Sequence, residues 1–409
     1  MRGTARTRGD RLTRIVDVLV DLQTSRFDRP LTYAVPDDMS VAVGDVVRIP
    51  IGRREAHGFV IADPHEGDAG HLKALLPSGT LVRAFDEVGL SLARWIAGYY
   101  LCSLREALSA VMYGGALPRS IDRLYRSPAR PSAERRGGVP ARLIDLVWEE
   151  FEDGFPLPSL LRHPEARRIA DRSALLRFVT SMVRDGVLTR KHDFGPPRMR
   201  DRVPGRRGRR VETARVEDER TFTPTSDQAT AIAALIEAVR AHTFAEFLLH
   251  GVTGSGKTHV YIEAVRAVIS AGDAAIVLVP EIALTPQTVA RFESAFGDRV
   301  AVLHSALSER QRYESWQAAA RSQRSVVVGA RSAVFAPLPN VRLIVVDESH
   351  ETSYKQENIP RYHAADVARR RMQEAGGVLL LGSATPSLEQ YWAACAQQTT
   401  LLTLRDRAT

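Results

Sequence analysis

Eight consecutive residues have the glycine and lysine spacing that binds nucleotide phosphates: Gly251, Val252, Thr253, Gly254, Ser255, Gly256, Lys257 and Thr258. Glycines there let backbone N–H groups cradle the phosphates, Lys257 would reach the β- and γ-phosphates, and the Thr258 hydroxyl would bind magnesium. An apolar strand-like run precedes the segment at residues 247–250, and a helix-like run follows it at 260–262. A glycine-rich turn without a ligand is the structural alternative, but this context favours a nucleotide site.

Two acids and a histidine follow a second apolar run, residues 343–346. Acids at the carboxyl end of a buried strand face the crevice where open α/β sheets bind ligands. Asp347 would hold magnesium through water, Glu348 would polarise the attacking water, and His350 would couple the site to neighbouring motifs. A helix N-terminus with acids on its dipole is the alternative. Beside an intact phosphate loop, the pattern predicts a DExH box that uses ATP and Mg²⁺.

A small-residue turn follows the last apolar run, at residues 382–386. Hydroxyls at Ser383 and Thr385 could bond the histidine of the DExH box and relay the state of the nucleotide. An ordinary strand-to-helix turn, with Pro386 at the first helical position, accounts for the same residues equally well. Taken by itself, this turn does not decide between coupling and a structural role.

Three further positions are candidates for ligand contact. Thr285 is placed as a helix N-cap before Pro286, and free N–H groups at such a helix start could bind a DNA phosphate. Arg331 and Ser332, after the run 326–328, offer a second phosphate contact. Capping alone is the alternative for both. Gln228, which precedes the phosphate loop, could bond the adenine edge, although any surface glutamine would look the same.

The elements that must position these residues alternate along the C-terminal half of the chain. Strand-like runs separated by helical stretches occur at residues 247–250, 275–279, 300–303, 325–328, 343–346 and 378–381. Such alternation predicts an α/β lobe with a mainly parallel sheet over residues 216–409. Ahead of it, short strand-like runs and then a helical pattern predict a small β-rich domain with helices at 15–117, and residues 140–194 read as a winged-helix-like α+β module.

Basic segments separate these three domains. Residues 1–14 are predicted to be a disordered basic tail, residues 118–139 a linker, and residues 195–215 a second, arginine-rich linker. The formal net charge is +8, which favours a polyanionic partner, nucleic acid first. No apolar run reaches the roughly 18 residues of a membrane span. With two distant cysteines, Cys102 and Cys395, the chain offers no zinc or disulfide framework, and a cytoplasmic location is expected.

Together the motifs resemble those of the primosomal protein N′ (PriA) family within helicase superfamily 2. The matching segments are GVTGSGKTHVY, LVPEIALTPQT, LHSALSERQR, VVGARSAVFAPL, VVDESHETSYKQE, PRYHAADVA and LLLGSATPSLE. Near the N-terminus, DRPLTYAVP, VGDVVRIPIG and LARWIAGYYLC resemble the 3′-DNA-binding domain of the family. The resemblance covers nearly the whole chain and is weakest over residues 118–215.

This resemblance implies a function for each part of the chain. Residues 15–117 would be the 3′-DNA-binding domain, and residues 216–409 the first RecA-like lobe of an ATP-dependent 3′-to-5′ DNA helicase that restarts stalled replication forks. Forked DNA, primosome proteins, single-stranded DNA-binding protein and the replicative helicase loader are the expected partners, with no membrane. Zinc is expected for the family but not within this chain, because the zinc module, second lobe and arginine finger would lie beyond Thr409.

Two departures from the family pattern bear on function. The box reads DESH where many members have DEEH, and Ser349 replaces an acid that is not a metal ligand, so we expect activity to survive. Leu31 and Thr32 stand where well-known members carry Phe-Asp in the pocket for the 3′ end. Thr32 can accept a hydrogen bond but carries no charge, so we expect a phosphate on the 3′ end to weaken fork binding only slightly.

Two hypotheses of different class remain. The chain is part of an ATP-dependent DNA helicase, or it is a scaffold for primosome assembly that binds ATP and fork DNA without unwinding. Intact Lys257, Asp347 and Glu348 favour the enzyme, whereas the missing second lobe favours the scaffold for these 409 residues. Another superfamily 2 translocase, such as a restriction subunit, would not account for the segments DRPLTYAVP and YYLC.

Overall fold

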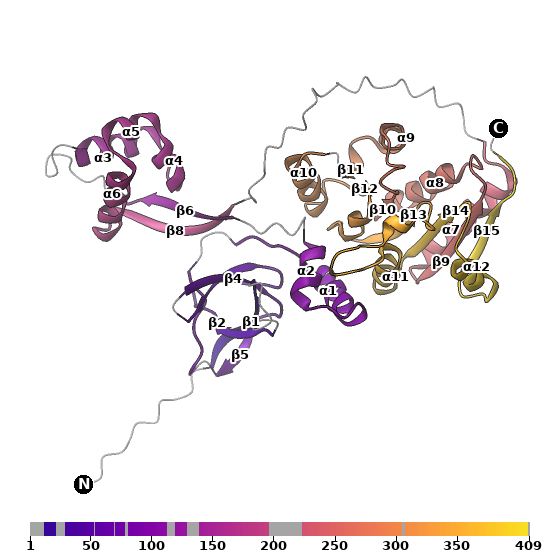
Figure 1. Ribbon diagram of the computed structural model, residues 1–409, viewed down its shortest axis with the longest axis horizontal. Helices are drawn as coiled ribbons and strands as arrows, with labels where there is room; N and C mark the ends of the chain where they lie inside the picture. Colours follow the sequence, from indigo (N-terminus) through magenta and orange to yellow (C-terminus); the bar gives the residue numbers. More distant parts are fainter. Residues whose placement is uncertain are drawn as a thin grey trace, which may run out of the picture. The chain divides into compact units, whose positions relative to one another are not determined.

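The computed structural model describes residues 12–21, 29–52, 54–68, 70–77, 81–112, 119–128, 139–195, 223–304 and 307–407 (Figure 1). Most of the predicted basic tail and basic linker, residues 1–11 and 196–215, lies outside these ranges. The chain divides into two compact units: Met1–Ala84 with Ala116–Arg198, and Phe85–Gly115 with Met199–Thr409. In the described ranges, no helix combines the length and the hydropathy needed to cross a membrane.

An antiparallel sheet forms the first part of the first unit. Its strands are β1 (Leu12–Val20), β2 (Leu31–Ala34), β3 (Val46–Ile51), β4 (Arg54–Val60) and β5 (His65–Asp68). They pair in the order β2-β1-β4-β3, with β5 also paired to β1. Alternate residues of β1 point into the core, where Val16, Val18 and Val20 are fully buried, as the two-residue period of a strand requires. The predicted β-rich domain is confirmed, and β5 is a strand that the sequence pattern did not indicate.

The second part of the first unit combines helices with a three-stranded sheet in the order β7-β6-β8. Its elements are β6 (Arg119–Arg126), α3 (Val139–Glu150), β7 (Phe155–Pro156), α4 (Leu157–Arg162), α5 (Pro164–Ile169), α6 (Arg172–Arg184) and β8 (Leu188–Gly195). Strand β8 follows α6 and pairs with β6 in a long antiparallel ladder, which has the form of a winged-helix module. The segment predicted as a linker, residues 118–139, therefore begins with a strand, which its charged sequence did not indicate.

A seven-stranded parallel sheet is the core of the second unit, with the order β11-β12-β10-β13-β14-β9-β15. The strands are β9 (Ala245–Gly251), β10 (Ala274–Leu278), β11 (Val300–Leu303), β12 (Val326–Gly329), β13 (Val341–Val346), β14 (Val378–Ser383) and β15 (Thr400–Leu404). Strands covered on both faces read as continuous apolar runs, and β10 and β14 are buried at every residue. The predicted α/β lobe with a parallel sheet is confirmed.

Helices and short 3₁₀ turns connect the strands of this sheet. They are α7 (Ser226–Ala241), α8 (Lys257–Ser270), α9 (Pro286–Phe296), η4 (Gly297–Arg299), α10 (Glu309–Ala320), η5 (Arg331–Phe335), η6 (Thr352–Tyr354), α11 (Ala364–Ala375) and α12 (Leu388–Cys395). Figure 1 shows helices on both faces of the sheet. This arrangement buries both faces of the central strands and leaves the strand ends for loops.

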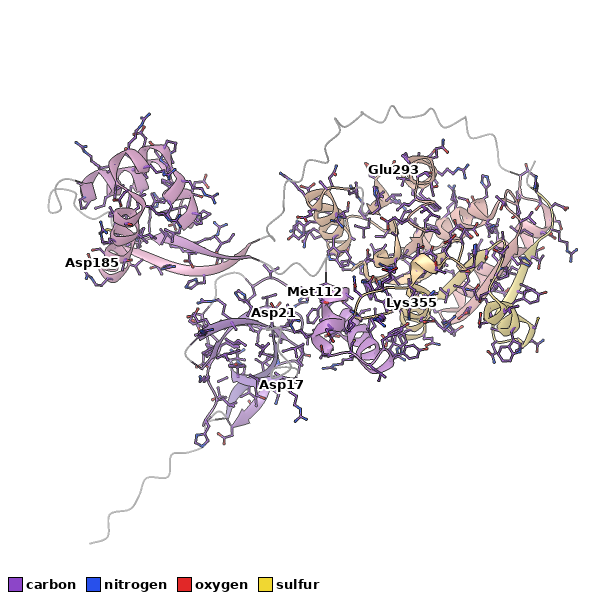
Figure 2. The ribbon with its side chains drawn as sticks, in the orientation of Figure 1. Asp17, Asp21, Met112, Asp185, Glu293 and Lys355 are labelled. Atoms are coloured by element: carbon purple, nitrogen blue, oxygen red, sulfur yellow. The ribbon has the colours of Figure 1, made fainter. Side chains whose placement is uncertain are left out.

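Two helices from the N-terminal half belong to the second unit: α1 (Glu87–Tyr99) and α2 (Leu104–Val111). The Tyr100 hydroxyl joins α1 to α11: it donates to Asp366 Oδ2 at 2.9 Å and accepts from the His363 backbone N–H at 3.0 Å. The Lys355 ammonium, labelled in Figure 2, lies 5.0 Å from the centre of the Tyr100 ring. Burial raises the pKa of Tyr100, so its hydroxyl stays protonated as the donor. The sequence pattern predicted a domain boundary near residue 117, whereas the two compact units divide at residue 85.

Replacing Tyr100 by phenylalanine should destabilise the second unit. The change keeps the ring but leaves the partly buried backbone N–H of His363 without its acceptor, which costs about 1–3 kcal/mol of unfolding free energy. Denaturant unfolding measures it. Tyr99→Phe is the matched control, because Tyr99 is 61% exposed and keeps its ring stacking on Trp95. Equal free energies of unfolding for the two variants would show that the hydrogen bonds of Tyr100 do not stabilise the second unit.

Candidate nucleotide site and DNA-contact residues

The phosphate loop lies between β9 and α8, as the sequence predicted. Gly254 and Gly256 have φ values of +83° and +80°, a region that L side chains rarely adopt. Lys257, only 8% exposed, folds over the loop, and its Nζ donates to the Gly251 carbonyl at 2.8 Å. The buried Ser255 hydroxyl has no hydrogen-bond partner among the described residues. A buried lysine and an unpaired hydroxyl within one loop fit a polyanionic ligand such as a nucleotide phosphate.

Gln228 supports this loop from α7. It is 1% exposed, its Oε1 accepts from the Thr225 N–H at 2.9 Å, and its Nε2 donates to the Ser255 carbonyl at 2.9 Å. Both polar atoms are therefore engaged within the protein, and the side chain caps its own helix. The predicted bond from Gln228 to an adenine edge stays a prediction that would require this carboxamide to turn.

Asp347 follows β13 at the edge where the phosphate loop lies. One carboxylate oxygen accepts from the Tyr261 hydroxyl at 2.9 Å. Burial raises the pKa of Asp347, and the bond from Tyr261 opposes that rise. The Tyr354 hydroxyl donates to the Asp347 backbone carbonyl at 2.6 Å and lies 3.1 Å from the Leu278 carbonyl, so it joins the ends of β13 and β10.

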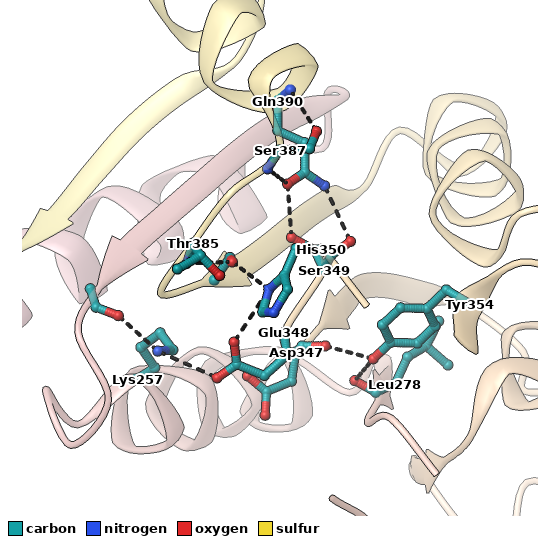
Figure 3. A network of polar contacts seen from close by, with 12 residues as sticks. Lys257, Leu278, Asp347, Glu348, Ser349, His350, Tyr354, Thr385, Ser387 and Gln390 are labelled. Atoms are coloured by element: carbon teal, nitrogen blue, oxygen red, sulfur yellow. Dashed lines mark hydrogen bonds and ion pairs between the residues drawn. The ribbon is translucent and has the colours of Figure 1, made fainter. Parts of the chain in front are cut away.

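Glu348 occupies the centre of a chain of polar side chains that Figure 3 shows. Its carboxylate lies 3.6 Å from Lys257 Nζ on one side and 3.6 Å from His350 Nδ1 on the other. The Glu348 backbone has a φ of +43°, a left-handed conformation that costs about 1–3 kcal/mol at a residue other than glycine. Backbone strain of this kind is concentrated at functional sites, where surrounding contacts hold the residue in place.

His350 continues this chain to β14. Its Nδ1 lies 2.8 Å from the Ser383 hydroxyl oxygen, which in turn accepts from the Thr385 backbone N–H at 3.0 Å. The structure thus brings together the predicted coupling residues His350 and Ser383, whereas Thr385 takes part through its backbone. Whether this contact relays the nucleotide state stays a prediction.

Ser349, the departure within the box, packs against α12. Its N–H donates to the Gly382 carbonyl at 2.9 Å, and its hydroxyl donates to Gln390 Oε1 at 3.3 Å. Ser349 is 3% exposed and bonds Gln390 rather than a charged group, in keeping with a position that is not a metal ligand. Sequence reasoning missed Gln390, as it missed Tyr261 and Tyr354, because residues of these types carry no local signal of a site.

The DNA-contact candidates of the second unit have definite structural roles. Thr285 is the N-cap of α9 and Pro286 its first residue, so that part of the prediction is confirmed. Arg331 donates from one guanidinium nitrogen to the Ser353 and Lys355 carbonyls at 3.0 and 2.6 Å, which fixes the segment after the DESH box. Ser332 is exposed beside it. Contact of these residues with DNA remains a prediction.

In the first unit, Leu31 and Thr32 begin β2 opposite β1. Thr32 pairs with Asp17 in the antiparallel register, and its hydroxyl donates to Asp17 Oδ1 at 2.7 Å. Figure 2 labels Asp17 on the sheet. The charge missing from positions 31 and 32 is thus supplied by the neighbouring strand, so the expectation of weak end discrimination no longer follows from Thr32 alone.

Thr258 and Asp347 are the residues that would hold magnesium. Mg²⁺ commonly uses one or two protein ligands and takes the rest from phosphates and water, so a hydroxyl and a carboxylate are chemically suited to the ion. Across the described ranges, no group of three or more His, Cys, Asp or Glu side chains is placed to bind a metal. Cys102 and Cys395 are free thiols.

Phosphate loop, acidic box and parallel sheet define the ATP-binding lobe of a helicase-type enzyme. In agreement, the family described as type III restriction enzyme, res subunit, matches residues 221–388, and the 3′DNA-binding domain (3′BD) family matches residues 17–113. Together these matches join a helicase lobe to a DNA-binding region. The chain belongs to the replication restart protein PriA family, whose members it resembles along most of its length.

Two relatives illustrate the similarity. Replication restart protein PriA of Bacillus subtilis is 31% identical over 96% of this chain and 56% of its own length. That of Chlamydia pneumoniae is 43% identical over 94% of this chain and 50% of its own length. The chain therefore spans about half the length of these curated relatives. Among solved structures, RecG bound to a three-way DNA junction aligns at 23% identity and a TM-score of 0.36, over 46% of this chain and 24% of that one.

Replacing Lys257 by alanine should abolish tight ATP binding and leave DNA binding unchanged. The ammonium would make charge-assisted bonds to phosphate, so its loss should weaken ATP binding by tenfold or more, about 1.5–3 kcal/mol. Binding of a fluorescent ATP analogue and of forked DNA, measured on the same protein, checks this. Loss of DNA binding in a folded variant would contradict the assignment of DNA binding to the region of residues 15–117.

Proposed function

We propose that this chain is the fork-binding and ATP-binding part of an ATP-dependent 3′-to-5′ DNA helicase that acts in replication restart. The observation that carries the proposal is the continuous chain from Lys257 through Glu348 and His350 to Ser383 (Figure 3). It joins the phosphate loop, the acidic box and the turn after β14. Such a chain contains the lysine and the acid that the first lobe would contribute to ATP hydrolysis, and a contact through which hydrolysis could be sensed.

Each residue of the nucleotide site has one task in the proposed mechanism. Lys257 leaves the Gly251 carbonyl and Glu348 to bind the β- and γ-phosphates. Thr258 and, through water, Asp347 would hold magnesium, which would supply charge neutralisation at the phosphates. Glu348, then free of the lysine, accepts a hydrogen bond from the attacking water and orients it. His350 Nδ1 lies close to both Glu348 and Ser383, so a shift of either segment reaches the other.

A scaffold without unwinding activity is the second candidate for these 409 residues. It is favoured by one observation: the described residues of the chain form a single RecA-like sheet. In superfamily 2 helicases, hydrolysis also uses an arginine from a second lobe. Primosome proteins, single-stranded DNA-binding protein and a replicative helicase loader are the protein partners that we propose for either function.

We further propose that the β-rich domain binds the 3′ end of DNA beside Thr32 and Asp17. The Asp17 carboxylate can accept a hydrogen bond from a free 3′-hydroxyl and would repel a 3′-phosphate. Leu31, which is 37% exposed, can pack against the terminal base or sugar. The match of residues 17–113 to the 3′DNA-binding domain family supports this assignment.

Blocking the 3′ end with phosphate should therefore weaken fork binding by tenfold or more, about 1.4 kcal/mol. Asp17→Asn should reduce this discrimination to about threefold or less, because the repelling charge is gone. Asp63→Asn is the matched control, since it removes the same charge from the exposed turn between β4 and β5. Equal affinity of the unchanged protein for both DNA ends would exclude Asp17 from end recognition.

Purified residues 1–409 should bind Mg-ATP and DNA but hydrolyse ATP very slowly and leave a fork annealed. An arginine supplied to the transferring phosphoryl group is worth about 10³–10⁵ in rate for GTPases, so its absence would cost about 4–7 kcal/mol of barrier. A forked substrate with ATP and magnesium tests this expectation. Strand separation, or DNA-stimulated turnover near about one per second, would show that this chain acts with a second lobe in trans.

A further inference from the structure

Tyr261 is a fully buried residue of α8, one helical turn after Lys257. It is 1% exposed, and its hydroxyl donates to Asp347 Oδ1 at 2.9 Å. Phenylalanine would fill the same space without burying a hydroxyl that needs a partner. The partner that this hydroxyl has is the carboxylate of the acidic box, which links the phosphate-loop helix directly to the residue that would hold magnesium.

The Tyr261 hydroxyl also explains why position 382 is a glycine. A Cβ added to Gly382, in β14, would lie 1.7 Å from the Tyr261 hydroxyl oxygen and 2.8 Å from the ring carbon that carries it. The φ of Gly382 does not lie in the positive region that favours glycine, so its backbone conformation gives no reason for that residue. Space for Tyr261 is therefore the constraint that keeps position 382 small.

Gly382 lies next to two other segments of the proposed site, the acidic box and the turn that follows β14. Its carbonyl accepts from the Ser349 N–H at 2.9 Å, and the next residue, Ser383, contacts His350. One hydroxyl thus touches the acidic box through Asp347 and the turn after β14 through Gly382. A carboxylate with a fixed hydrogen bond on one oxygen has fewer orientations than a free one, and magnesium requires a near-ideal octahedral geometry.

We propose that Tyr261 is the positioning residue for magnesium: its hydroxyl holds the Asp347 carboxylate in one orientation, and Gly382 leaves the space for that hydroxyl. The proposal rests on the nucleotide site proposed above. It assigns no chemistry to Tyr261 itself, which reaches the metal only through Asp347.

The first test is a magnesium titration of nucleotide binding. Tyr261→Phe should raise the magnesium concentration for half-maximal binding of a fluorescent ATP analogue by about fivefold to tenfold. Binding without magnesium should stay within about twofold, because Lys257 and the loop are unchanged. Tyr362→Phe is the matched control, since Tyr362 is 4% exposed and its ring packs edge-on against Phe335, away from Asp347. An equal magnesium requirement in the unchanged protein and Tyr261→Phe, or equal rises in both variants, would overturn the proposal.

The second test needs no nucleotide. Gly382→Ala should lower the melting temperature strongly in the unchanged protein and less in the Tyr261→Phe background, because the contact at 1.7 Å is then gone and only the ring contact at 2.8 Å remains. In the Tyr362→Phe background the two effects should add. Additive effects with Tyr261→Phe would overturn the assigned contact.

The outcomes separate this proposal from the proposed function. An unchanged protein that binds no Mg-nucleotide refutes the nucleotide site and, with it, the role of Tyr261. An unchanged protein that binds normally, with a Tyr261→Phe variant that has the same magnesium requirement, refutes the role of Tyr261 alone.

Discussion

The nucleotide site depends on the register of three neighbouring parallel strands. β14 pairs with β9 on one side, so that Ser383 lies opposite His250, and with β13 on the other, so that Leu381 lies opposite Val346. Parallel strands end at the same edge of a sheet, and this register therefore brings three loops from distant parts of the sequence to one place. A slip of one residue in either pair would turn every side chain of that strand to the opposite face.

The site that results has a strained backbone at Glu348, and it is held by neutral groups as much as by charges. Glu348 has a left-handed backbone, and burial raises the pKa of Asp347 beside it. Two tyrosines balance these costs: Tyr261 bonds the Asp347 carboxylate and Tyr354 its backbone carbonyl. A hydrogen bond from a neutral donor stabilises the carboxylate without placing a second positive charge beside Lys257, which stays available for phosphate.

The DNA-binding region is divided between two compact units. Residues 17–113 match one family, yet β1 to β5 lie in the first unit and α1 and α2 in the second. Tyr100 attaches α1 to the rest of the second unit, because it bonds Asp366 and the His363 N–H while Lys355 lies over its ring. The segment that carries Lys355 follows the DESH box and is held by Arg331 as well. Helices contributed by the DNA-binding region thus contact the segment next to the acidic box.

The sequence by itself determined the local features of this protein. Glycine and lysine spacing identified the phosphate loop, continuous apolar runs identified six of the seven strands of the parallel sheet, and Thr285 before Pro286 identified a helix start. These features depend on residues close together in the chain. The family resemblance drew on the same local segments, and it covered residues whose individual roles the pattern left open.

Only the tertiary structure decided which distant residues meet. Asp17 supplies a charge to Thr32 because β1 and β2 pair in one register, and Gln228 supports the phosphate loop because α7 packs beside it. Tyr261 read as an ordinary core residue until β14 placed Gly382 against its hydroxyl. Apolar periodicity states that a face is buried but not against what, since many strand orders bury the same face equally well. The partners of buried polar groups are therefore set by strand order and register, which no local pattern contains.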